Sequence, residues 1–362
     1  IERADLYKWL VDELKTNVEP KLGEPQPKTS ATAGYGSVDK AAAWMLLARL
    51  YLNAEVYTGT ADWANAKLYA KKVIDSPYKL YTTKKGQWSA YQQLFMGDNG
   101  ESGASVEAIF PILQDGKTTT SYGTTLYLMA GSNDNSEHIK DATTKGNNTT
   151  AGWGGNRMRP DLVQKFFPNN DAPNIGAYAM PAAADDDRAL FDGDGRNVDN
   201  GNNETEVKVF TNGFAVCKFT NFKTDGSAGH NSSFPDTDFF LMRAAEAYLI
   251  YAEADARMNG GTTTTDGTQY INALRSRAHA TTHTAYSLRQ ICDEWSREFY
   301  FEGLRRTTLI RFGYFGGNVN YNWSWKGGVK SGRNFDTHLN LFPIPSSDLT
   351  ANDNLVQNQG YN

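Results

Sequence analysis

The first residues of the chain carry leucines at helical spacing. Leu6, Leu10 and Leu14 stand four residues apart, which places them on one face and predicts a helix over residues 3–15. A linker that contains proline and glycine follows at residues 19–36 and interrupts the pattern. The chain therefore opens on an amphipathic helix.

Two helical hairpins are predicted from a shared spacing of large and small residues. Helices at residues 38–55 and 63–74 form the first hairpin, while residues 238–258 and a helix around Ile271 and Leu274 form the second. The first helix of each hairpin follows the W-x2-L-[GA]-x2-Y type of spacing found in tetratricopeptide repeats. The residues at this spacing are Trp44, Leu47, Ala48 and Tyr51, and then Leu241, Ala244, Ala245 and Tyr248.

The stretch between the hairpins, about residues 81–235, lacks this periodicity and is rich in Gly, Asn, Asp and Thr. Loops of this length inside a compact protein are usually functional or disordered. Disordered segments are poor in aromatic residues, whereas this one contains several, so we favour a functional role. Among them are Trp88, Tyr91, Tyr122, Tyr127 and Trp153.

Taken together, these patterns indicate a mainly α protein that forms one domain over residues 1–362. We expect tetratricopeptide-like helical repeats at 1–80 and a long irregular insertion at 81–235. A further helical repeat and an irregular C-terminal strap follow at 236–362, with little helix after residue 312.

Composition narrows the classes of partner. The 362 residues carry a net charge of -5, so no basic excess is available to bind the phosphates of a nucleic acid. Aromatic residues make up 12% of the chain, which favours flat binding surfaces. No run approaches the roughly 20 apolar residues of a membrane-spanning helix. Common metalloprotease, serine hydrolase and nucleotide-binding motifs are missing.

Two other functional classes stay open at this point. A glycoside hydrolase needs two carboxylates that can be distant in the sequence, so motifs do not exclude it. A protein-binding helical-repeat scaffold would explain the hairpins but leaves the aromatic-rich insertion without a role.

Acidic residues form a ridge near the C-terminal end of the chain. Glu294, Glu298 and Glu302 recur every four residues on a predicted helix that ends at Gly303. Like charges at this spacing repel, so we expect basic partners. The ridge could be an active site, but we favour an ion-pair network that clamps the C-terminal segment. The candidate partners are Arg297, Arg305, Arg306 and Arg311.

Several segments together resemble the SusD family, a group of cell-surface glycan-binding lipoproteins of Bacteroidetes. The stretch Asp293–Arg306 and the upstream segment Ala48–Gly59 both carry this resemblance. So do Trp323–Gly328, Phe342–Pro345 and Gln357–Tyr361. These motifs are long and occur in the same order along nearly the whole chain.

The resemblance implies a non-catalytic protein at the outer-membrane surface. It would bind starch or malto-oligosaccharides, or alternatively a different glycan, and deliver them to a SusC-like, TonB-dependent transporter, on which the helical repeats would dock. A lipid anchor would tie the protein to the membrane. We expect the anchor and the first helical repeats of the family to lie in an N-terminal portion that this chain does not include.

Within the family, the insertion resembles that of starch-binding members, whose aromatic residues form an arc around a helical glucan. Tyr122 and Trp153 fall on two positions of that arc, and its remaining members belong to the missing N-terminal portion. The alternative is that both rings pack in a small core of the insertion. Glycines such as Gly123 and Gly154 leave room for exposed rings at turns.

A metal site is also implied. Asp236 and Asp238 form a D-x-D pair before the second predicted hairpin, where one of them could simply cap a helix. The family resemblance instead implies Ca²⁺, with Gln114 and Asp98 as further ligands from the insertion. Oxygen ligands of this kind suit Ca²⁺.

Overall fold

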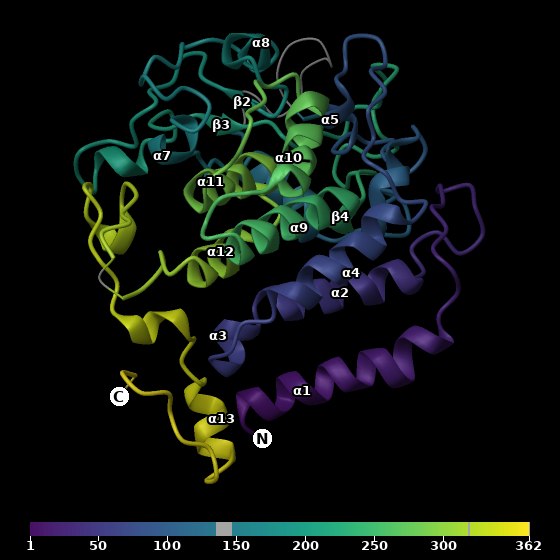
Figure 1. Cartoon of the computed structure of the whole chain (residues 1–362). Helices are drawn as coiled ribbons and strands as arrows, with labels where there is room; N and C mark the ends of the chain where they lie inside the picture. Colours follow the sequence, from purple (N-terminus) through teal and green to yellow (C-terminus); the bar gives the residue numbers. More distant parts are fainter. Residues whose placement is uncertain (135–146, 318, 362) are drawn as a thin grey trace. The chain divides into compact units, whose positions relative to one another are not determined.

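The computed structural model of the chain describes residues 1–134, 147–317 and 319–361 (Figure 1). Residues 135–146, which belong to the predicted insertion, lie outside the described residues. The chain forms two units, a first unit at Ile1–Glu302 and a second unit at Gly303–Asn362.

Helices carry most of the regular structure of the first unit, as the sequence predicts. They are α1 (Arg3–Glu13), α2 (Lys40–Leu52), α3 (Ala54–Thr58), α4 (Trp63–Asp75), α5 (Ala90–Gln93), α6 (Thr124–Gly131), α7 (Pro160–Val163), α8 (Met180–Ala184), α9 (Ala244–Met258), α10 (Thr265–Arg277) and α11 (Leu288–Phe299). Two short antiparallel pairs join β1 (Ala108–Ile112) to β4 (Phe239–Arg243) and β2 (Phe191–Asp192) to β3 (Ala215–Val216). The mainly α fold predicted from the sequence is confirmed.

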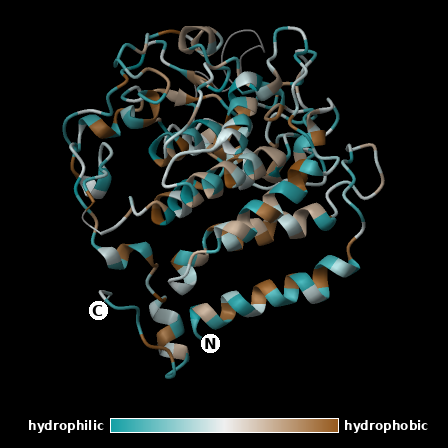
Figure 2. Ribbon diagram, viewed as in Figure 1, coloured by the Kyte–Doolittle hydropathy of each residue, from teal (hydrophilic) through white to brown (hydrophobic). Residues whose placement is uncertain are grey.

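Helix α9 lies at the centre of the helical layer. It packs against α4, α10 and α11, while α4 also packs against α2 (Figure 1). Its buried alanines, among them Ala247 and Ala252, allow neighbouring helices to approach closely. Hydrophobic residues recur along α2 and α4 (Figure 2), as the spacing that predicts these helices requires. The Asp39 side chain caps α2 by accepting a hydrogen bond from Ala41 N at 2.9 Å.

The second predicted hairpin begins differently from the prediction. Residues 239–243 form strand β4 instead of the first turns of a helix, and α9 begins only at Ala244. The strand pairs with β1, with Ile112 opposite Phe239 and Phe110 opposite Met242. This pairing joins segments far apart in the chain, so a pattern within residues 238–258 does not report it.

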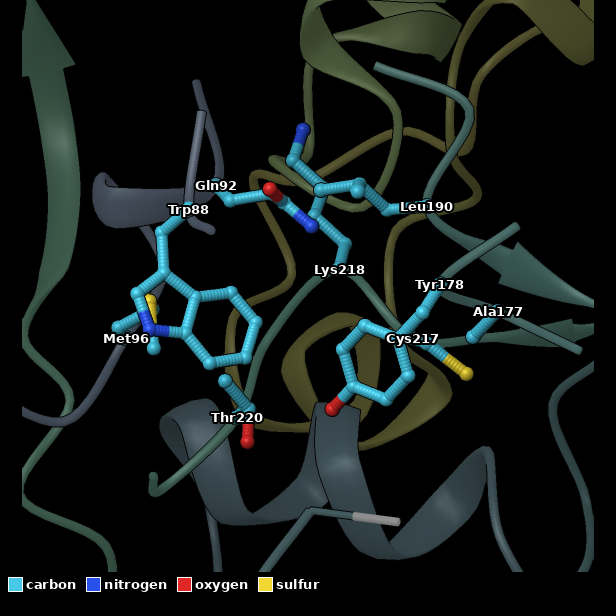
Figure 3. A pocket seen from close by; sticks show the side chains of 9 residues that line it. All are labelled: Trp88, Gln92, Met96, Ala177, Tyr178, Leu190, Cys217, Lys218 and Thr220. Atoms are coloured by element: carbon cyan, nitrogen blue, oxygen red, sulfur yellow. The ribbon is translucent and has the colours of Figure 1, made fainter. Parts of the chain in front are cut away.

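A small cavity lies inside the insertion. Its volume is about 30 Å³, which suits a water molecule or two but not a sugar ring. Trp88 lies on one side and Tyr178 on the other (Figure 3), with ring centroids 5.8 Å apart. The aromatic residues Trp88 and Tyr91 are buried, so these two serve the core and not a binding surface.

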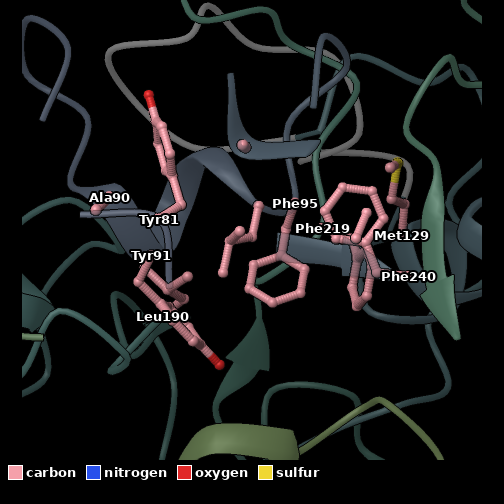
Figure 4. Close-up of a cluster of buried hydrophobic side chains, with 11 residues drawn as sticks. Tyr81, Ala90, Tyr91, Phe95, Met129, Leu190, Phe219 and Phe240 are labelled. Carbon is pink, nitrogen blue, oxygen red and sulfur yellow. The ribbon is translucent and has the colours of Figure 1, made fainter. Parts of the chain in front are cut away.

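A hydrophobic cluster joins the insertion to the strands (Figure 4). Aromatic rings dominate it, and Phe95 makes edge-to-face contacts with both Tyr91 and Phe219. Met129 brings the buried side of α6 into the same cluster. Its members are Tyr81, Ala90, Tyr91, Leu94, Phe95, Ala104, Ala108, Met129, Leu190, Phe219 and Phe240.

Adjacent to this cluster, the acidic ridge of α11 and the turn after it forms a buried ion-pair network. Arg243, which is fully buried, binds Glu298 at 2.7 Å and Glu302 at 2.7 Å. The same guanidinium binds Glu107 at 2.9 Å, next to β1. The remaining ion pairs link Arg188 to Asp186, Glu294 and Glu298, Arg277 to Glu107 and Glu298, Lys218 to Glu302, and Arg275 and Arg297 to Glu294.

This network confirms an ion-pair role for the ridge. Of the predicted partners, Arg297 is confirmed by its ion pair with Glu294 at 2.6 Å. The other ion pairs described for the ridge connect it with β4, α10 and the insertion. The predicted clamp on the C-terminal segment, through Arg305, Arg306 and Arg311, stays a prediction.

Helix α11 also ends earlier than predicted, at Phe299 and not at Gly303. The carbonyl groups at its end are bound by side chains instead of by a further helical turn. Tyr91 Oη donates to Glu298 O at 2.6 Å, and Lys218 Nζ donates to Tyr300 O at 2.8 Å. Gly303 does adopt the left-handed conformation expected of it, with φ at 81°.

Burial and charge act in opposite directions on Glu298. Desolvation by itself raises the pKa of this carboxyl group, but the attraction of Arg277, Arg243 and Arg188 outweighs burial and lowers its pKa to about 2. The pKa of Glu294 is lowered in the same way, with burial opposed by Arg188, Arg297 and Arg275. Both side chains are therefore carboxylates at neutral pH.

The second unit contains α12 (Arg305–Arg311), α13 (Ser346–Ala351) and short 3₁₀ turns. Its rings stack closely, with Tyr314 and Tyr321 centroids 4.6 Å apart and nearly parallel. Arg306 lies over the rings of both Phe315 and Phe342. Across both units, no helix among residues 1–134, 147–317 and 319–361 is long and apolar enough to cross a membrane.

We expect the Glu298→Gln substitution to lower the free energy of unfolding by about 3–5 kcal/mol at pH 7, because it leaves buried arginines facing a neutral amide. The pKa of Glu298 is lower in the folded chain than its ordinary value of 4.5. Its stabilising contribution is therefore complete above pH 4.5 and is lost as the pH falls towards 2. Urea unfolding between pH 7 and pH 2 measures both effects.

The matched control is Glu24→Gln, which removes one partner of the exposed ion pair between Lys40 and Glu24. Exposed ion pairs contribute little, so this variant should unfold like the parent chain. Equal stability of the Glu298 and Glu24 variants would show that the buried network does not hold the first unit together.

Candidate functional site

The two residues predicted to bind glycan lie at opposite ends of α6. Tyr122 precedes the helix, which begins at Thr124. Trp153 lies next to the C-terminal end of the helix, where its backbone N–H donates a hydrogen bond to Ala130 O at 2.8 Å. The next residues extend this contact, since Gly155 N donates to Gly131 O at 2.9 Å. The end of α6 therefore fixes the loop that carries Trp153.

A second set of contacts ties Tyr122 to the same loop. The Tyr122 ring meets Phe234 edge to face, with centroids 5.3 Å apart. Two residues earlier, Ser232 O accepts a hydrogen bond from Thr150 N at 2.6 Å. Because Thr150 is close in sequence to Trp153, these contacts connect the segments that carry the two rings. We call α6 with these two flanking segments the α6 platform.

Both predicted rings are exposed. Tyr122 is 70% exposed and Trp153 is 46% exposed. The alternative considered from the sequence, in which both pack in a small core of the insertion, does not describe their environment. Gly154 at φ 58° forms the turn beside Trp153 and matches the expectation that glycine makes room for an exposed ring.

Tyr127 is a member of the α6 platform that the sequence analysis names among the aromatic residues of the insertion but does not predict as a glycan-binding residue. It lies on α6 and is 52% exposed, with its ring centroid 6.1 Å from that of Trp153. The helix is only eight residues long, so its sequence carries too few turns for a periodicity that would separate exposed from buried positions. Its aromatic character and its place in the insertion were the available signals.

The first residue of α6 is conformationally unusual. Thr124 has φ at 55°, a left-handed conformation that is an outlier for a β-branched residue. Its hydroxyl donates to Gln114 Oε1 at 3.1 Å. This hydrogen bond connects the α6 platform to an open cleft that contains all four predicted metal ligands.

The cleft has a volume of about 380 Å³. Asp98, Gln114, Asp236 and Asp238 all line it, together with Tyr35 and His230. The structure therefore brings the four predicted ligands into one cavity, although they come from segments more than a hundred residues apart.

The three predicted aspartate ligands, Asp98, Asp236 and Asp238, already accept hydrogen bonds. The Tyr35 hydroxyl donates to Asp238 Oδ2 at 2.6 Å, and Gln114 N donates to Asp238 Oδ1 at 2.7 Å. His230 N donates to Asp236 Oδ2 at 3.0 Å. Thr224 N donates to Asp98 Oδ1 at 3.0 Å. Within the described ranges, no three acidic, histidine or cysteine side chains form a ready metal-binding group.

Two observations nevertheless fit a cation in the cleft. Asp236 Oδ1 is buried and has no hydrogen-bond partner among the described residues. Burial raises the pKa of Asp238 to about 6, and repulsion by Asp236 and Glu101 adds to this against the opposing hydrogen bonds from Tyr35 and Gln114. A bound cation would give Asp236 Oδ1 a partner and would reduce the repulsion among the acids.

The D-x-D pair has no helix to cap. Asp236 and Asp238 precede strand β4, and α9 starts only at Ala244. The helix-capping alternative is therefore wrong, because the residues that follow the pair are drawn into the strand pairing with β1.

A sequence model of the SusD family matches residues 181–361. The chain is also 39% identical over 390 aligned positions to the starch-binding protein SusD of Bacteroides thetaiotaomicron. That alignment covers 99% of this chain but 66% of the relative, so the chain spans slightly less than two thirds of the length of that protein.

Solved structures share the fold. A SusD-like protein from Bacteroides fragilis superposes with a TM-score of 0.66 at 18% identity, over 99% of this chain and 71% of the other. Surface glycan-binding protein A from Bacteroides thetaiotaomicron, solved in complex with laminarihexaose, superposes with a TM-score of 0.62 at 22% identity. This second match covers 98% of this chain and 70% of the other. The prediction of a non-catalytic role agrees with relatives that are named for binding.

Proposed function

This chain belongs to the SusD family, and from that membership we propose that it binds starch or malto-oligosaccharides at the α6 platform through Tyr122 and Trp153. The observation that carries the proposal is the exposure of both rings, 70% for Tyr122 and 46% for Trp153, at the two ends of α6. A relative that is 39% identical and is named for starch binding supports the choice of glycan.

Neutral sugars suit such a surface. Each sugar ring has apolar C–H faces, on which flat aromatic rings stack, and a rim of hydroxyl groups. Burying one ring contributes about 1.5–3 kcal/mol. Two partly exposed rings therefore give a modest affinity, which allows the ligand to be passed on.

The proposed role is binding without catalysis. Asp115, a carboxylate in the cleft beside the platform, is held by hydrogen bonds from Thr118 and Thr119, and these keep its pKa below the usual range. Asp115 therefore cannot donate the proton that glycoside hydrolysis requires. Asp238 in the same cleft has a pKa raised to about 6, but both of its oxygens are bound by Tyr35 and Gln114, and we assign it to the proposed cation site. If a reducing-sugar assay detected maltose released from starch by the protein, this part of the proposal would be overturned.

We further infer delivery of the glycan to a SusC-like, TonB-dependent transporter. In this proposal the protein works at the outer-membrane surface, held by a lipid anchor, and docks through its helical repeats. Family membership is what supports this inference. The insertion would then remain accessible for the glycan.

A structural Ca²⁺ in the cleft is the last element of the proposal. Asp236, Asp238, Asp98 and the Gln114 side chain supply hard oxygen donors, and the orphaned Asp236 Oδ1 points to a missing partner. When bound, the cation would neutralise the repelling acids. The chain's own residues would then hold the loop before β4 against the insertion.

The Trp153→Ala substitution should weaken binding of maltoheptaose at least tenfold, because it removes a stacking ring from an exposed turn. Tyr122→Ala should act in the same direction. Isothermal titration calorimetry measures both. Tyr178→Ala, which removes an exposed ring beside the small cavity, is the matched control and should bind like the parent. Unchanged affinity in the Trp153 variant would contradict the proposed site.

Added calcium should raise the melting temperature of the protein, because an ion that binds only the folded state stabilises it. The Asp236→Asn substitution should abolish this shift, since it removes the negative charge of the carboxylate to which the unpartnered oxygen belongs. Asp225→Asn, at a fully exposed turn, should leave the shift intact. Elemental analysis of calcium-supplemented protein gives an independent readout. Protein without bound metal and without a thermal shift would reject the calcium site.

Charge reversal on the helical repeats should disrupt co-purification with the transporter, since electrostatic complementarity guides docking. Lys8→Glu changes an exposed position of α1, and Lys15→Glu changes an exposed position of the π-helical turn Leu14–Val18 that follows it. Lys208→Glu changes an exposed position in the insertion and is the matched control. If only the Lys208 variant lost co-purification, the insertion and not the helical repeats would contact the transporter, which would contradict this proposal.

A further inference from the structure

We propose that Tyr127 is a third sugar-stacking residue, which forms with Trp153 an angled pair of rings that holds two successive residues of a neutral oligosaccharide. This inference rests on the proposed glycan-binding function and adds a residue to its site.

The first step is the orientation of α6. Its buried residues include Leu126, Met129 and Ala130, which turn towards the hydrophobic core. Tyr127 lies on the opposite side of the helix and is 52% exposed. An aromatic side chain placed outward on a short, anchored helix contributes little to the core, so its large apolar surface remains available to a ligand.

The second step is the geometry of the two rings. The centroids of Tyr127 and Trp153 are 6.1 Å apart, and the ring planes are inclined by 53°. Two rings at this angle cannot both lie flat against the same sugar ring. Two consecutive sugar residues, turned relative to each other, can each stack on one of them. The pair therefore suits an oligosaccharide that changes direction between residues.

The third step is rigidity. Tyr127 is fixed by the helix, and the backbone of Trp153 is fixed by its hydrogen bond to Ala130 O at 2.8 Å. Gly154 N adds a hydrogen bond to Asn133 O at 2.8 Å. The backbone positions from which the two rings extend are thus set before a ligand arrives, which lowers the entropic cost of binding.

Tyr178 provides the contrast within the same insertion. It is also exposed, at 37%, and also faces another aromatic ring. That ring, Trp88, is buried, and the space between them measures about 30 Å³. A sugar has no second ring to stack on there, so Tyr178 serves as the control position.

The test compares Tyr127→Leu with Tyr127→Phe by calorimetry, using maltoheptaose and, as a second probe, laminarihexaose. Tyr127→Leu removes the flat ring and should weaken binding of the oligosaccharide that the parent prefers by about fivefold to tenfold, consistent with a partly buried ring. Tyr127→Phe keeps the ring and should bind within about twofold of the parent, as should Tyr178→Leu.

A double-mutant cycle with Trp153→Leu tests whether the rings act together. If both contact adjacent residues of one ligand, the combined loss in the double variant should differ from the product of the single losses. Independent effects would overturn the angled pair, even if each ring contributes. Melting temperatures confirm that the variants remain folded, and Tyr127→Gln replaces Tyr127→Leu if the leucine variant does not fold.

The outcomes separate this inference from the proposed function. Loss of binding in Trp153→Ala with parental affinity in Tyr127→Leu would reject Tyr127 and keep the platform. Weakened binding in Tyr127→Phe as well would show that the ring face is not the contact. A parent protein that binds neither oligosaccharide would overturn the platform, and the role of Tyr127 with it.

Discussion

The fold of the first unit depends on the burial of Arg243 among carboxylates. A guanidinium without access to water is stable only when every charge near it is matched, and Glu298, Glu302 and Glu107 provide that match. These partners come from α11, from the turn after it and from the segment before β1. Removal of one partner would leave the remaining buried charges unpaired, so the network couples the helices to the β-strands. It fixes α11 against its neighbours more strictly than apolar packing alone would.

The insertion takes part in the same network, which explains how a segment with little regular structure can hold a site. Arg188 and Lys218 extend from the insertion to Glu294 and Glu302, and both cations are fully buried. The hydrophobic cluster then connects this base to the inner side of α6 through Met129. The outer side of α6 is left free to present rings. An anchored base and an exposed outer side are the arrangement that a preorganised binding surface needs.

Local patterns predicted what local interactions determine. The spacing around Trp44 and Tyr51 predicted α2, because helix periodicity is set within a few residues. The strand at residues 239–243 was missed, since its partner lies more than a hundred residues away. For the same reason the sequence pointed to arginines near the acidic ridge, whereas Arg188 and Arg243 reach it from afar. The exposure of Tyr122 and Trp153 was anticipated from flanking glycines and family resemblance, but that of Tyr127 required the helix itself.

The network also explains why Glu294 and Glu298, whose spacing first suggests an active site, do not take part in catalysis. A glycoside hydrolase needs a carboxyl group that is protonated near neutral pH beside one that is ionised. Glu294 and Glu298 are buried and kept ionised by arginines, so neither can reach a substrate or donate a proton to it. The rings that flank α6 carry no charge and remain partly exposed. Uncharged rings suit the apolar faces of sugars, so the exposed side of α6 offers what the proposed glycan binding needs, and the buried acids do not.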